Sequence, residues 1–184
     1  MTPVTILEPT PPDDPDIDPK IVASGHDTSR VMVGAGMVMF ASYPNGIEDP
    51  APSVVVGKPL WLGERKAHFQ WVLDATLIAG YGTYSHHAQL AALPGFGFNM
   101  YWGPRVGVEV RGGPAGFAQI GSRTVAGLGM GGIGAFVIRP FADDRQRVKL
   151  WATMSMGFPL ADDSMNDFIG SGAMGVGVGY ETPY

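Results

Sequence analysis

The sequence predicts an all-β fold, in which an eight-stranded antiparallel up-and-down β-barrel follows an extended Pro/Asp-rich N-terminal arm. Hydrophobic residues recur with a period of two from residue 29 onward, which is the spacing of strands with two different faces. The chain of 184 residues contains 27 glycines and 16 prolines, a composition that disfavours long helices. The alternating segments are also far longer than the about 5–6 residues usual in soluble proteins.

The predicted arm spans residues 1–28 and differs in composition from the body, residues 29–184. The arm contains six acidic residues and one basic residue, Lys20, so it carries the whole net charge of -5. Its six prolines are typical of an extended tether without a core of its own. We expect the arm to make few contacts with the body and to be available to a protein partner. The body has no net charge, which argues against nucleic-acid binding.

Eight segments of the body alternate clearly enough to be predicted as strands. Their ranges are 30–43, 52–62, 65–81, 87–102, 104–120, 124–140, 145–158 and 168–181. The first segment is apolar on both faces, so its inward face is not assigned. The third is the clearest, because Phe69, Trp71 and Leu73 begin a continuous apolar face while Asp74 lies on the opposite one.

The later segments repeat this division with different residues. In 104–120, Val106, Val108 and Val110 alternate with charged residues, and in 145–158 Leu150 lies opposite Arg147 and Lys149. Segments 87–102, 124–140 and 168–181 place large apolar residues opposite a face made chiefly of glycine. Glycine on that face suits the interior of a narrow barrel, which has little room for side chains.

The connections between these segments alternate in predicted length. Short links fall at 62–65, 102–105 and 140–145, and longer links fall at 43–51, 82–86, 112–123 and 157–167. Alternate connections of an up-and-down barrel lie at opposite ends. The pattern therefore predicts one end with short turns and one with long loops, as in outer-membrane barrels.

The two faces favour a barrel that spans a membrane. We expect the apolar face to contact membrane lipid through Phe69, Trp71, Leu73, Val106, Val108, Val110, Leu150, Val176 and Val178. We expect the opposite face to form a charge network in the lumen from Asp74, Arg105, Glu109, Arg111, Arg147 and Lys149. Opposite charges must pair there, because an unpaired buried charge costs several kcal/mol.

Two runs of residues carry a family resemblance. Residues 95–102 alternate glycine with aromatic residues, lead into Gly103-Pro104, and continue into the alternating run 105–110; the chain closes with a similar run at 175–184. These runs resemble the small eight-stranded bacterial outer-membrane barrels of the OmpA transmembrane-domain and OmpX-like group. The resemblance implies a Gram-negative outer-membrane location and a last strand whose terminal aromatic residue, here Tyr184, is recognised during insertion.

The resulting hypothesis is a non-enzymatic outer-membrane barrel that acts as a structural anchor or assembly subunit. We expect a mature chain without its signal sequence, because the first residues are not the basic and apolar residues of a leader. We expect no cofactor or metal, since the chain lacks cysteine and its four histidines lack ligand spacing. The small residues of the glycine-rich faces permit an oligomer.

Two other functions stay open. The first is a soluble β-rich subunit of a large assembly, such as a virion. Its strands would show the same alternation, but the apolar face would point inward and the polar face outward. A lipid-modifying outer-membrane enzyme would use Ser85 with His86 or His87. That chemistry needs a base within hydrogen-bond distance of the hydroxyl and a third group to orient the base.

Overall fold

The structure is a computed structural model, and the residues that it describes cover most of the body. They are residues 28–43, 46–47, 50–63, 68–82, 86–103, 105–121, 125–140, 146–162 and 170–183. The predicted arm therefore lies outside the described residues except at residue 28, and so do Ser85 and Tyr184. Within the described part of the chain, no helix is long and apolar enough to cross a membrane.

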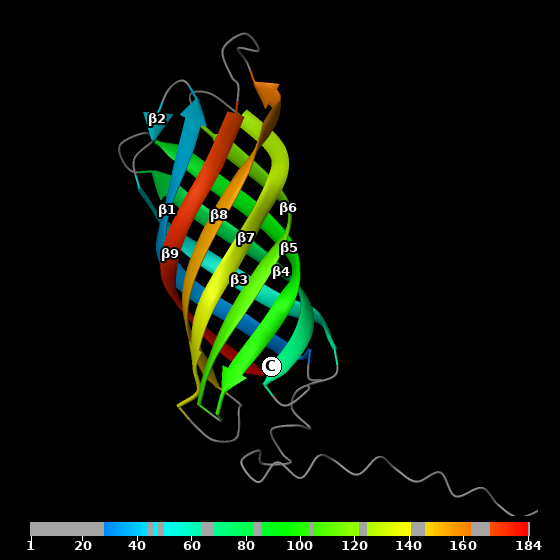
Figure 1. The fold of residues 1–184 in the computed structure, drawn as a ribbon. Coiled ribbons are helices and arrows are strands. Elements are labelled where there is room, and N and C mark those ends of the chain that lie inside the picture. The colour runs from blue at the N-terminus through cyan, green and yellow to red at the C-terminus, as the bar shows by residue number, and fades with distance from the viewer. Residues whose placement is uncertain are drawn as a thin grey trace, which may run out of the picture.

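Eight long strands form a closed antiparallel barrel (Figure 1). They are β1 (Arg30–Tyr43), β3 (Ala51–Leu62), β4 (Phe69–Gly82), β5 (His87–Trp102), β6 (Val106–Ile120), β7 (Val125–Ile138), β8 (Arg147–Asp162) and β9 (Gly170–Pro183). Each of them pairs with its neighbour in the chain, and β1 pairs with β9 to close the wall. The two-residue β2 (Gly46–Ile47) adds to the end of β1. The predicted eight-stranded barrel is confirmed.

The start of β1 and the end of β9 lie side by side, because Arg30 pairs with Pro183. We call this the terminal end, where Figure 1 marks the C-terminus, and we call the opposite end the distal end. The predicted difference in connection length between the ends is wrong. Connection 139–146 at the terminal end is longer than 83–86 and 121–124 at the distal end.

The long link predicted at 112–123 is wrong, because its glycine and proline residues do not end the strand. Residues 112–116 contain Pro114 and three glycines, yet they lie inside β6. The ladder between β6 and β7 continues through them, from Val106 opposite Ile138 to Gln119 opposite Val125. The continuous pairing with β7 thus overrides the local preference for a turn.

Side chains alternate between the lumen and the outer face on all eight strands. In β1, where the sequence left the faces unassigned, Met32 and Val38 point inward and are buried. The outer face carries large exposed hydrophobic residues around the whole wall, for example Val33, Val54, Leu77, Leu90, Val110, Leu128, Leu150 and Val178.

The lumen has two halves of different composition. The distal half is mainly apolar and contains Val38, Val55, Ile78, Ala91, Leu93, Ala115, Phe117 and Ala173. The terminal half is polar and contains Arg30, Gln70, Asn99, Glu109, Arg111, Arg139, Arg147, Lys149 and Glu181. Trp151 packs against two glycines between the halves, since a Cβ on Gly36 or Gly177 would lie 2.5 Å from its Cζ2 atom.

The lumen charge network as candidate functional site

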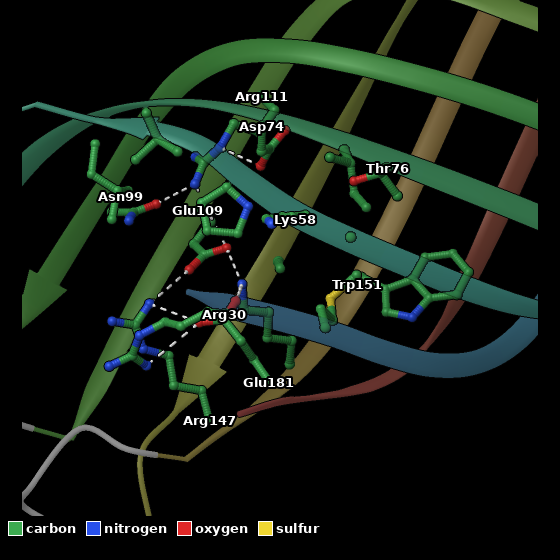
Figure 2. A pocket seen from close by; sticks show the side chains of 18 of the residues that line it. Arg30, Lys58, Asp74, Thr76, Asn99, Glu109, Arg111, Arg147, Trp151 and Glu181 are labelled. Carbon is green, nitrogen blue, oxygen red and sulfur yellow. Dashed lines mark hydrogen bonds and ion pairs between the residues drawn. The ribbon is translucent and has the colours of Figure 1, made fainter. Parts of the chain in front are cut away.

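Glu109 of β6 is the centre of the charged cluster in the terminal half of the lumen (Figure 2). Its Oε2 atom accepts a hydrogen bond from Lys149 Nζ at 2.8 Å. Arg111 Nη2 lies 3.7 Å from the same oxygen, and Arg147 Nη1 lies 3.8 Å from Oε1. All four side chains are buried, so three basic groups share the single negative charge of this carboxylate.

Glu181 near the end of β9 is the second buried acid of this cluster. It contacts Arg147 Nη1 at 3.2 Å and Arg30 Nη1 at 3.7 Å, and it also forms an ion pair with Lys149 Nζ. Lys149 therefore bridges Glu109 and Glu181. The contacts join β1, β6, β8 and β9 through side chains, in addition to the backbone ladder.

Arg111 extends the network to the other side of the lumen. Its Nε donates to Asp74 Oδ2 at 2.8 Å, and its Nη1 donates to the backbone oxygen of Phe98 at 2.6 Å. Its Nη2 also donates to Asn99 Oδ1, and Asn99 Nδ2 donates to the Tyr101 hydroxyl at 2.9 Å. Figure 2 shows Arg111 between Asp74 and Asn99. The network thus reaches β4 and β5.

Arg139 just beyond β7 is almost fully buried beside Tyr101. Its guanidinium carbon lies 4.1 Å from the centre of the Tyr101 ring, which is the geometry of a cation–π interaction. Its backbone N–H donates to the carbonyl of Arg105 at 2.8 Å. This contact fastens the end of β7 to the turn before β6.

Five of the six residues predicted for the lumen network lie in the cluster: Asp74, Glu109, Arg111, Arg147 and Lys149. Arg105 does not, and this part of the prediction is wrong. β6 begins at Val106, so Arg105 lies in the preceding turn, where the alternation of the strand does not apply and its side chain is exposed.

Sequence reasoning missed Arg30, Asn99, Arg139 and Glu181. Glu181 had a usable signal, because it follows Tyr180 of the outer face and so falls on the inward face of the last strand. Asn99 had the same signal between Phe98 and Met100. Arg139 had it as well, because the predicted segment 124–140 places it next to the outward Ile138. Arg30 had none, because the faces of its strand were ambiguous.

The nine residues predicted to contact lipid all lie on the outer face. Trp71, Leu73, Val110, Leu150, Val176 and Val178 are exposed there. Val106 and Val108 are half-buried by their neighbours. Phe69 is also half-buried, because its ring stacks on Phe98 at 5.3 Å and meets Trp71 edge-on at 5.0 Å. These rings form an aromatic patch near the terminal end.

The free space beside the network is small. A cavity of about 40 Å³ lies between the charged cluster and Trp151. At about 10–15 Å³ for each water molecule, it has room for roughly three waters and for no larger solute. At the level of the charged cluster, the lumen is therefore filled by side chains of the described residues, as expected for a barrel of eight strands.

The described residues give no support to a metal site or a completed catalytic triad. No three histidine or acidic side chains of the described ranges gather as ligands. His86 is exposed in the turn before β5, with a φ of 56°. The side chain of His87 lies outside the described set, as does Ser85.

No protein-family model matches the chain. No curated protein matches its sequence either.

Solved structures match the fold. Neisserial surface protein A is 9% identical, with a TM-score of 0.58 over 84% of this chain and 96% of that chain. Ail, the attachment invasion locus protein of Yersinia pestis, is 7% identical, with a TM-score of 0.55 over 83% and 96%. The outer membrane enzyme PagL is 11% identical, with a TM-score of 0.51 over 84% and 99%. The chain therefore has the fold of small bacterial outer-membrane β-barrels, as the family resemblance implied.

Proposed function

We propose that this protein is a non-enzymatic outer-membrane barrel that serves as a structural anchor or assembly subunit. The observation that carries the proposal is the filled lumen. Glu109 and Glu181 tie β1, β6, β8 and β9 together across the interior, and the remaining cavity of about 40 Å³ is too small for a solute path.

The outer face supports a membrane location for this anchor. Exposed Val, Leu, Met and Phe side chains surround the wall, whereas the charged groups of the cluster point into the lumen. In water this arrangement would expose a large apolar surface and bury an ionic cluster. In a bilayer the nine predicted outward residues contact hydrocarbon. Membrane lipid is thus the first partner of the protein.

The position of β1 suggests how the anchor is used. Residues 1–28 precede β1, which starts at the terminal end beside the end of β9. The terminal end faces the periplasm in this proposal, so the acidic arm is available there to a protein partner. The barrel then holds the partner at the membrane without transporting anything itself.

Conductance of the full chain in planar bilayers tests the closed lumen. We expect the folded protein to insert and to give no open-pore current. A matched pair of variants sharpens the measurement: Glu109→Ala removes the centre of the network, and Arg105→Ala removes an exposed charge beside it. Current through the wild-type protein would contradict the anchor function, as would a folded chain that stays soluble without detergent.

Similarity to PagL favours one second candidate, a lipid-modifying enzyme that uses Ser85 with His86 or His87. Mass spectrometry of membrane lipids from cells with and without the protein separates the two functions. The anchor function predicts the same lipid composition in both. A modified lipid that disappears in the Ser85→Ala variant would favour the enzyme.

A further inference from the structure

The outer wall has a large apolar hollow where β4, β5, β6 and β7 run side by side near the distal end. Its volume is about 810 Å³. Its lining consists only of Val, Leu, Ile, Ala, Gly and Phe, from Val54 and Val56 of β3 across to Leu128 of β7. Most of its lining residues point outward, on the face where the exposed hydrophobic residues gather. The others are inward residues that lie between them in the wall: Ile78, Ala91, Phe117 and Gly127.

Small side chains on the outer face create this hollow. Two rows of paired residues cross the four strands: Leu77, Ala92, Gly116 and Leu128 in one, and Ala79, Leu90, Ala118 and Ala126 in the other. The middle of the first row is Ala92 and Gly116, between two exposed leucines. The floor is therefore close to the backbone of β5 and β6, and the leucines form its sides.

The β5–β6 ladder is interrupted next to the hollow, on its terminal side. Ala92 pairs with Gly116 and Phe96 pairs with Gly112, but the residues between them are unpaired across this ladder. Pro94 and Pro114 face outward in this gap, and neither has an N–H to donate. The strands stay close, because a Cβ on Gly113 would collide with the Pro94 carbonyl oxygen.

We propose that this hollow binds one hydrocarbon chain of a membrane lipid. The inference rests on the membrane location proposed above. A hydrocarbon chain suits the site because no lining residue carries a polar side chain, whereas the rim of an interface with a soluble protein is polar. A chain seated on Ala92 and Gly116 contacts both leucines and covers the ladder gap at Pro94.

Native mass spectrometry of the full chain, released from vesicles of phosphatidylethanolamine and phosphatidylglycerol, tests this site. We expect one lipid molecule to stay on the wild-type barrel. Gly116→Phe should lower the lipid-bound fraction by about tenfold, since its ring takes the place of several methylenes of the chain. The position accepts a side chain, because a Cβ there meets only Leu128 Cδ2 at 3.6 Å.

Ala152→Phe is the matched control, because Ala152 is an exposed outward residue of β8 and lies outside the hollow. It should keep the lipid. Ala92→Leu is a second filling variant in case Gly116→Phe does not fold, as judged by heat-dependent mobility on gels. Equal lipid retention in the filling variants and the control would overturn the proposal, as would a wild-type barrel that inserts but keeps no lipid.

Two further outcomes would contradict different parts of the proposal and can be distinguished from each other. A wild-type mass of two chains that Gly116→Phe reduces to one would assign the hollow to a second copy and overturn the lipid site. A chain that does not insert into the vesicles at all would contradict the membrane location itself, and hence the proposed function.

Discussion

In the terminal half of the lumen, Glu109 and Glu181 each contact three basic side chains, whereas in the distal half Val38, Val55 and Phe117 pack without any charge. Both halves fill the same narrow space between the same eight strands. The stability of the ionic half depends on particular partners, because removing one charged side chain leaves the opposite charges buried without a counter-charge. The apolar half depends on volume, because hydrophobic swaps of similar size are tolerated.

The largest effect should come from the centre of the ionic half. Glu109→Gln keeps the shape of the side chain but removes the charge shared by Arg111, Arg147 and Lys149, so it should lower the free energy of unfolding by about 3–5 kcal/mol. Urea unfolding in lipid vesicles measures this. Combining it with Lys149→Met should cost less than the sum of the two single changes. Simple additivity would mean that the ion pair contributes nothing to stability.

The boundary between the halves should respond next most strongly. Gly177→Ala adds a methyl group that collides with the Ala35 carbonyl oxygen of β1 and with Trp151 Cζ2, so we expect a loss of about 1–3 kcal/mol from overpacking. The same unfolding measurement serves. Gly116→Ala on the outer face is the control, because its Cβ has room and the change should be small. A neutral Gly177→Ala would show that Trp151 is not packed against this wall.

The apolar half should respond only to volume. Ile78→Val removes one methylene from the buried apolar cluster and should cost about 0.5–1.5 kcal/mol. Its effect should add to that of Glu109→Gln, unlike the coupled effect expected inside the ionic cluster. Non-additive free energies of unfolding for this pair would mean that the halves form one cooperative unit.

The smallest effect should be that of the exposed arginine. Arg105→Ala should change the free energy of unfolding by less than about 0.5 kcal/mol, as is usual for surface positions. Arg111→Ala, six residues further along the same hairpin arm, should cost several times more. Similar losses of unfolding free energy for the two variants would show that Arg105 belongs to the lumen network, as the alternation of residues predicts.

The alternation of residues was enough to predict the barrel and the faces of most strands. Glu109, Arg111 and Lys149 were found because each lies inside a strand with a continuous apolar face opposite. The alternation does not predict which charged side chains pair with each other in the lumen. That pairing depends on the register of strands that are not neighbours in the sheet. Lys149 of β8 reaches Glu109 of β6 across β7, where Ala135 is the residue paired with Glu109.

The errors in the site and in the connections have a physical cause in cross-strand pairing. Arg105 lies just outside a strand whose first residue depends on cross-strand pairing rather than on local sequence. Arg30 lies on a strand with two apolar faces, so only its pairing with β9 assigns it to the lumen. The misjudged connections have the same origin, because barrel pairing keeps glycine- and proline-rich residues such as 112–116 in a strand.

A spin-label scan of β6 tests most directly whether the apolar face points outward to lipid and the charged face inward. The chain has no cysteine, so single cysteines at positions 106 and 108–111 of β6 can carry a spin label in lipid vesicles. We predict that labels at 106, 108 and 110 collide with oxygen dissolved in the bilayer, while labels at 109 and 111 are shielded from it. Labels at 109 and 111 that are freely accessible to a water-soluble reagent, with 106, 108 and 110 shielded, would contradict this orientation and make the protein a soluble barrel.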